Sequence, residues 1–119
     1  YFLSFPSREA RDASWKAFSA DPEWKAVAAK SEENGKIVSK IESTFLTATD
    51  FSPELKIRKK GGRVFELRTY KATPNHLPNL LERFRDHTLK LFDKHGMTNV
   101  VYWTEADKDD MLVYLLAHK

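Results

Sequence analysis

The chain has 119 residues, a length that fits one domain with a core of ordinary size. Apolar residues make up 41% of it and aromatic residues 13%, which argues against disorder. The net charge of +3 is too small to indicate nucleic acid as a partner, and the lack of cysteine excludes disulfides and Cys-type zinc sites. No apolar stretch is long enough for a membrane-spanning helix.

The first third of the chain predicts a strand followed by a helix with a break. Residues 1–5 form an aromatic-rich run ended by a proline, which is typical of a strand. Ser7 is a favourable N-cap, and small residues recur behind it at helical spacing. Asp21 is followed by proline and glutamate, a second helix start. We therefore expect a break near residues 19–22 and a helix end at residues 34–35.

Residues 37–46 alternate between apolar and polar side chains and predict a half-buried strand, with Ile37, Ile41 and Phe45 on one face. The segment 47–62 contains a proline, two glycines and most of the basic residues, so it indicates a linker. We interpret the basic run as a solvated connector, although a binding patch is the alternative; its members are Lys56, Arg58, Lys59, Lys60 and Arg63.

The second half of the chain predicts one long helix among three strands. Residues 63–70 alternate as a strand does, and a turn at residues 73–75 follows. An amphipathic helix ended by Gly96 comes next, with a stripe of Leu77, Leu80, Leu81, Phe84, Thr88, Leu91 and Phe92. Residues 99–104 and 111–118 then predict two strands joined by a hairpin turn at residues 107–110.

The predicted order is β-α-β-β-α-β-β, which is a ferredoxin-like β-α-β-β-α-β unit in permuted order. The last strand resembles the first, because two of the six positions from Tyr114 are identical to those from Tyr1 and two are conservative exchanges. Only one copy fits the central slot of a ferredoxin-like sheet, so we expect the other to lie at an edge or in another chain. In that sheet the strand at residues 37–46 would neighbour the strand at residues 63–70.

Several short segments resemble the NIPSNAP family and follow its order cyclically along nearly the whole chain. They are Phe65-Glu66-Leu67-Arg68-Thr69-Tyr70, Arg85-Asp86-His87-Thr88, Lys94-His95-Gly96-Met97, Tyr102-Trp103-Thr104, Asp21-Pro22-Glu23-Trp24 and Phe51-Ser52-Pro53. In the family a repeat begins at the Glu-Leu-Arg-Thr-Tyr strand and ends just before Phe-Ser-Pro, and tandem copies are common. This chain therefore resembles the back half of one repeat (residues 1–53), a basic linker (residues 54–62) and the front half of the next (residues 63–119).

The resemblance implies a dimeric α+β barrel, in which two antiparallel ferredoxin-like sheets, each with helices on one face, pack against each other. It implies no known reaction and no catalytic residues. Family members have been linked to mitochondria and to vesicle-related processes in animals. We accordingly expect a cytoplasmic location if the protein is bacterial, and a mitochondrial one is compatible with a eukaryotic source.

A candidate ligand site follows from the strand at residues 63–70. If Phe65 and Leu67 contact the helices, then Glu66, Arg68 and Tyr70 face the interior of the barrel. We expect them to share that face with residues of the other strands, namely Trp103, Tyr114 and His118.

Two interpretations of this face remain open. An apolar cavity with a few convergent polar groups is the usual form of a small-molecule site. Arg68 could hold a carboxylate or phosphate there, and His118 could exchange a proton near neutral pH. Alternatively, Glu66 and Arg68 form a cross-strand pair that steadies a dimer contact.

The histidines indicate neither a metal site nor a cofactor. His87 lies beside the apolar stripe, where we interpret it as a partly buried packing residue; it is also the residue to test as a haem-type ligand. His95 suits the negative end of a helix, and His76 falls in a turn. No pair has the spacing of a helical metal site.

Two function classes remain. The first is a small-molecule-binding or interaction module that forms homo-oligomers by sheet-face packing or strand exchange, with neither nucleic acid nor a transmembrane segment involved. The alternative is a cofactor-independent enzyme of the barrel superfamily, monooxygenase-like or isomerase-like, that acts in the barrel cavity. No nucleotide-binding or hydrolase motif favours other chemistry.

Overall fold

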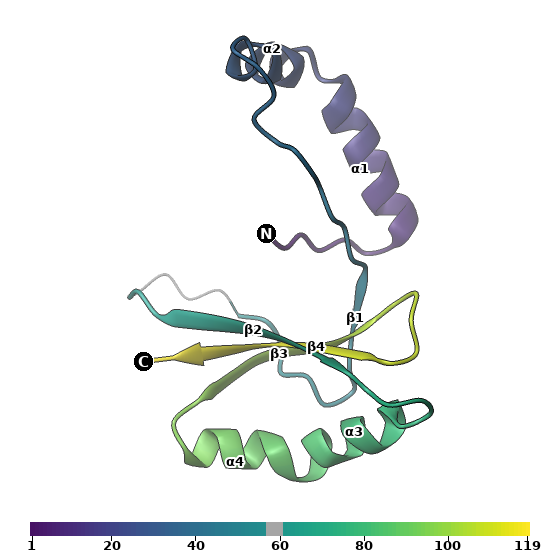
Figure 1. Cartoon of the computed structure of the whole chain (residues 1–119), viewed down its shortest axis with the longest axis vertical. Coiled ribbons are helices and arrows are strands. Elements are labelled where there is room, and N and C mark those ends of the chain that lie inside the picture. Colours follow the sequence, from purple (N-terminus) through teal and green to yellow (C-terminus); the bar gives the residue numbers. More distant parts are fainter. Residues whose placement is uncertain (57–60) are drawn as a thin grey trace. The chain divides into compact units, whose positions relative to one another are not determined.

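A computed structural model describes residues 1–56 and 61–119 of the chain. It divides into two compact units, Tyr1–Glu42 and Ser43–Lys119, which we call unit 1 and unit 2. Figure 1 shows the helices of unit 1 and the sheet with its covering helix in unit 2. The two units are described separately below.

Unit 1 consists of the helices α1 (Arg8–Ala20) and α2 (Pro22–Ser31). Each helix begins where the sequence predicts it, because a side-chain oxygen accepts a backbone N–H of the first turn. The Ser7 hydroxyl accepts from Ala10 at 3.1 Å, and the Asp21 carboxylate accepts from Glu23 at 2.8 Å. The predicted break is thereby confirmed at Asp21.

Two predicted strands are wrong. Residues 1–5 form no strand, and of residues 37–46 only the last enters the short strand β1 (Leu46–Ala48). Side chains of both segments are strongly exposed: Tyr1 is 97% exposed and Ile41 is 79% exposed. An extended segment becomes a strand only by hydrogen bonding to a neighbour. Their sequences have strand character, but over residues 37–44 the described part of the chain provides no neighbouring strand.

Unit 2 contains a four-stranded antiparallel sheet, so the predicted α+β class is confirmed and the architecture is consistent with a ferredoxin-like fold. Besides β1, its strands are β2 (Val64–Lys71), β3 (Thr98–Glu105) and β4 (Met111–His118), in the order β1-β3-β4-β2. The predicted hairpin turn between β3 and β4 is also confirmed. One correction concerns β1, which pairs with β3 at the edge opposite β2, whereas the sequence predicts it beside β2.

One helical run covers the lower face of the sheet in Figure 1. It consists of α3 (Leu77–Arg83), the π-helical turn η1 (Phe84–Thr88) and α4 (Leu89–Lys94). In η1 the Leu89 N–H donates to the Phe84 carbonyl, five residues back. This extra residue rotates the rest of the helix. The predicted stripe is therefore wrong at Leu91, which is 52% exposed, whereas Phe92 packs on the core as predicted and Leu89, which was not predicted, joins it.

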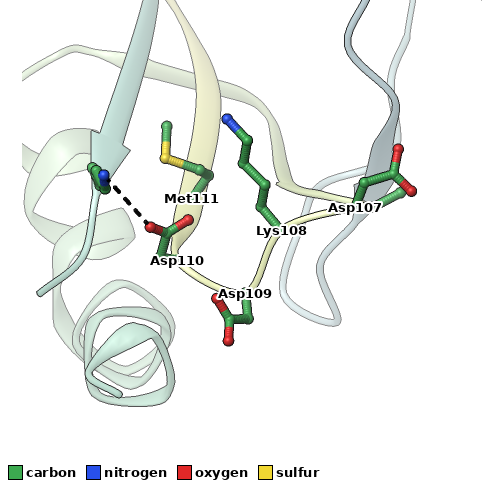
Figure 2. A pocket seen from close by; sticks show the side chains of 7 residues that line it. Asp107, Lys108, Asp109, Asp110 and Met111 are labelled. Carbon is green, nitrogen blue, oxygen red and sulfur yellow. Dashed lines mark ion pairs between the residues drawn. The ribbon is translucent and has the colours of Figure 1, made fainter. Parts of the chain in front are cut away.

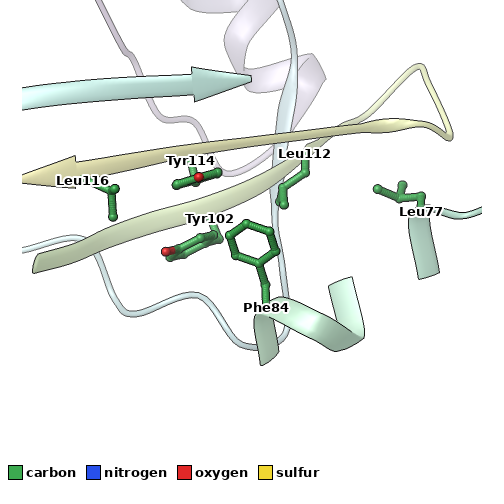
Figure 3. Close-up of a cluster of buried hydrophobic side chains, with 6 residues drawn as sticks. All are labelled: Leu77, Phe84, Tyr102, Leu112, Tyr114 and Leu116. Carbon is green, nitrogen blue, oxygen red and sulfur yellow. The ribbon is translucent and has the colours of Figure 1, made fainter. Parts of the chain in front are cut away.

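The core lies between this helical run and the sheet. Figure 3 shows its buried side chains, which are Leu77, Phe84, Tyr102, Leu112, Tyr114 and Leu116. The rings of Tyr102 and Tyr114 stack with centroids 4.9 Å apart, and the Phe84 ring lies 5.2 Å from that of Tyr114. Aromatic side chains from β3, β4 and η1 thus fix the helix on the sheet.

The facing of β2 is the reverse of the prediction. Because Arg68 pairs with Tyr114 and Tyr70 with Leu112, the even-numbered residues of β2 lie on the helix-covered face. Phe65 and Leu67 point to the other face and are 59% and 53% exposed. Alternation separates the two faces of a strand but does not identify the inner one, which the core aromatics of β4 decide here.

Candidate functional site: the two faces of the unit 2 sheet

A polar cluster occupies the helix-covered face of β2, and Arg68 lies at its centre. The guanidinium donates from Nε to the Tyr114 hydroxyl at 3.0 Å and from Nη2 to the Tyr70 hydroxyl at 3.1 Å. Its Nη1 donates to the Glu66 carboxylate at 3.1 Å. The His118 Nε2 lies 3.3 Å from the other Glu66 oxygen. Five of the six predicted site residues are thus brought together.

The cluster connects β2 to β4 at the surface. The side chains of Arg68 and Glu66 are 41% and 43% exposed, and that of His118 is 32% exposed. Ion pairs at this exposure contribute little free energy to folding. The predicted cross-strand pair of Glu66 and Arg68 is wrong, because both lie on β2, two residues apart, and pair along the strand.

The two tyrosines differ in acidity because they share hydrogen bonds. The hydrogen bond with Tyr114 lowers the pKa of Tyr70 most, and the Arg68 guanidinium lowers it further against the effect of burial. Burial raises the pKa of Tyr114, and its hydrogen bond to Tyr70 adds to that increase. Both phenol groups raise the pKa of Arg68, which stays charged. Tyr70 is therefore the more acidic of the pair.

The other predicted site residues lie elsewhere. Trp103 pairs with Val113, whose side chain points away from Tyr114, so Trp103 lies on the opposite face from the cluster. His87 lies in η1 and is exposed, which corrects the predicted partial burial. The His76 Nδ1 lies 2.9 Å from the Thr73 hydroxyl at the start of α3, and His95 lies at the end of α4.

The sequence interpretation missed a contact between two of the family-like segments. Asp50 accepts two hydrogen bonds from Arg85, at 3.0 and 2.8 Å, and the Arg85 guanidinium lies 5.4 Å from the centre of the Phe51 ring. The Ser52 hydroxyl accepts from the Tyr102 N–H at 2.9 Å. Residues 49–53 are therefore held on the sheet. The prediction of a linker that starts at residue 47 is wrong for this segment. The basic residues at 57–60 lie outside the described residues.

A solvent-open hollow of about 760 Å³ lies at the turn between β3 and β4, shown in Figure 2. Both charge signs line it, and Lys71 approaches Asp110 to 4.0 Å across it. None of the predicted site residues lines this hollow. Over residues 1–56 and 61–119, no three His, Asp or Glu side chains are grouped to hold a metal ion. No described helix is long and apolar enough to cross a membrane.

The second face of the sheet has no helix of unit 2 over it, as Figure 1 shows, and is largely apolar; we call it the open face. Leu67 of β2 pairs there with Leu115 of β4, and Phe65 pairs with Ala117. Leu115 in turn pairs with Val101 of β3. The open face therefore carries apolar side chains on three strands, and their exposure differs: Phe65 and Leu67 of β2 are more than half exposed, whereas Val101 and Ala117 are buried, at 4% and 1%.

Comparison with known proteins places the chain in a family. The model of the NIPSNAP family matches residues 1–53 and 65–116, two segments that together make up most of the chain and are consistent with a tandem-repeat arrangement. No curated protein and no solved structure gives a match. Because the match includes both the helices of unit 1 and the sheet of unit 2, the chain belongs to the NIPSNAP family.

Proposed function

We propose that this NIPSNAP-family chain is an association module whose open face packs against the open face of a second copy. The observation that carries the proposal is the exposure of Phe65 and Leu67, which are 59% and 53% exposed at the middle of β2. Singly exposed apolar residues are ordinary, but a contiguous apolar patch marks an interaction site. Two sheets stacked in this way form the dimeric α+β barrel that the family resemblance implies.

The contact of two such faces is energetically plausible. Covering the exposed half of a Phe or Leu side chain contributes roughly 1 kcal/mol, so Phe65 and Leu67 together contribute roughly 2 kcal/mol on each face. Stable interfaces remove about 1,200 to 2,000 Å² from solvent in total. Because the axis of a homodimer is twofold, each residue of the open face contributes twice.

The mass in solution tests the proposal. Leu67→Asp places a charge in the middle of the open face, whereas Leu91→Asp places one on α4 at nearly the same exposure, 52% against 53%. Light scattering during size exclusion should give wild type and Leu91→Asp twice the chain mass of 13.8 kDa. Leu67→Asp should shift toward 13.8 kDa, with a dissociation constant raised at least about 100-fold. An unchanged mass for a folded Leu67→Asp variant would contradict face-to-face association.

A second candidate function, small-molecule binding, rests on the Arg68 guanidinium. Arginine has five N–H donors, and three of those of Arg68 donate within the cluster, which leaves two for a ligand. We infer that these could bind a small carboxylate or phosphate. Titration of acetate or inorganic phosphate should then shift the NMR signals of Arg68 and Tyr70 saturably in wild type and not in Arg68→Leu. NMR shifts that grow linearly with acetate or phosphate concentration and do not saturate would contradict specific binding by Arg68.

A further inference from the structure

The outer edge of β2 has backbone groups directed to solvent. The strand is eight residues long and ends the sheet, and no strand within residues 1–56 and 61–119 lies beyond it. The Ala72 N–H donates to the Asp110 carbonyl, so the even-numbered residues turn their backbone groups toward β4. The N–H and C=O groups of Phe65, Leu67 and Thr69 then point outward. An edge of this kind accepts another strand.

A segment that could fill this edge lies in unit 1. Residues 37–44 have the alternation of a strand with two different faces, yet they form no regular structure. Ile37 and Ile41 are 67% and 79% exposed on the apolar face. On the other face Lys40 and Glu42 pair at 2.6 Å, and both side chains are about three-quarters exposed. The segment has a strand pattern without a strand partner among the described residues.

Unit 1 also lacks a core. No residue of α1 or α2 is buried, and the stacked rings of Phe18 and Trp24 are 42% and 41% exposed. A unit of this size that buries no side chain has too little hydrophobic burial to be stable alone. It needs another surface to pack on.

We propose that residues 37–44 of one copy pair with the outer edge of β2 in a second copy. This deepens the proposed association by naming a second, separate contact. The faces are complementary: the isoleucines lie on the side of Phe65 and Leu67, while Lys40 and Glu42 lie on the side of Glu66 and Arg68. Each pairing partner therefore offers a basic and an acidic side chain to the other.

Chain reach explains why the segment comes from a second copy. The Phe45 carbonyl accepts the Ala106 N–H at 2.9 Å, which fixes residue 45 beside β3. Ile41 is four residues away and can lie at most about 14 Å from it. A strand beyond β2 lies four strand spacings from β1, about 19 Å. With β1 in place, the segment cannot reach the β2 edge of its own sheet. Reciprocal exchange would make each contact twice and close the dimer.

Hydrogen exchange measured by NMR on the full chain tests the strand exchange. In wild type the amides of Phe65, Leu67 and Thr69 should exchange about 100-fold more slowly than in Ile41→Asp, which disrupts the apolar face of the segment. The amides of even-numbered β2 residues, paired with β4, should stay protected in both and show that the sheet is folded. Leu91→Asp is the control and should match wild type.

A mixing experiment identifies the donor. Isotope-labelled Ile41→Asp has an intact edge, and unlabelled Thr69→Pro has an intact segment and an edge that proline blocks. After mixing, the labelled Phe65 and Leu67 amides should regain protection. Fast exchange of these amides in wild type, or no recovery on mixing, would overturn the proposal. Ile41→Asp leaves the residues of the open face unchanged, so its mass in solution reports on face-to-face association, while the protection of the β2 amides reports on the strand exchange.

Discussion

Replacing Phe84 by alanine is the sharpest test of how the helical run is held on the sheet. The side chain is 1% exposed, and its ring lies within 6.3 Å, centroid to centroid, of four other aromatic rings. Those rings belong to Tyr70, Phe92, Tyr102 and Tyr114. Phe84 also begins η1, where the helix changes its phase. Its loss should therefore weaken the packing of the helical run on the three long strands, β2, β3 and β4, which supply three of these rings.

The expected cost is large relative to the stability of a small domain. A buried Phe side chain removes about 150 to 250 Å² from water, which at about 25 cal/mol per Å² corresponds to roughly 4 to 6 kcal/mol. Measured losses for Phe→Ala in cores are about 3 to 5 kcal/mol. We expect about 4 kcal/mol, against a total stability of roughly 5 to 15 kcal/mol for ordinary domains.

Urea unfolding followed by far-UV circular dichroism measures this cost. Leu91→Ala is the matched control, because its side chain is on the same helical run but 52% exposed, and it should cost less than about 1 kcal/mol. If Phe84→Ala does not fold, Phe84→Leu should still fold with a smaller loss. A loss for Phe84→Ala no greater than that for Leu91→Ala would refute the packing of the helix through this ring.

Two further predictions concern titration. In an absorbance titration Tyr70 should ionise below the ordinary tyrosine pKa, and this early step should be absent from Tyr70→Phe. Burial raises the pKa values of the two other tyrosines, Tyr102 and Tyr114. Because those two folded pKa values are raised, the folded state should lose stability as the pH rises above about 10. The Arg85 hydrogen bond lowers the pKa of Asp50, so its stabilising effect is present above about pH 4 and lost below it. The melting temperature of Asp50→Asn should therefore fall less on acidification than that of wild type.

Local chemistry explains why the sequence predicts the helices well. Ser7 and Asp21 cap α1 and α2 through their own side chains, so a few neighbouring residues determine both starts. The hairpin turn and the ranges of β2, β3 and β4 follow from alternation and turn residues in the same way. No local residue pattern indicates the π-helical turn η1, which rotates the following helical residues about the helix axis. The prediction that Leu91 faces the core is wrong for this reason.

The candidate site was predicted in part. Period-two alternation placed Glu66, Arg68 and Tyr70 on one face, and the structure adds Tyr114 and His118 as expected. The same alternation gave the wrong inner face, because β2 carries apolar side chains on one side and an aromatic, hydrogen-bonded row on the other. Contact with buried aromatics on β4 selects the second, and such contacts are not visible in a local pattern.

The sequence by itself determined the family, the α+β class and the starts of α1 and α2, since all three depend on residue types at short spacing. Only the tertiary structure decided that residues 1–5 and 37–45, which have strand-like sequences, lie outside the sheet, and which face of β2 is covered. The physical reason is that a strand needs a hydrogen-bonding neighbour from elsewhere in the chain or from another chain. For residues 37–44, our proposal is that this neighbour is β2 of a second copy.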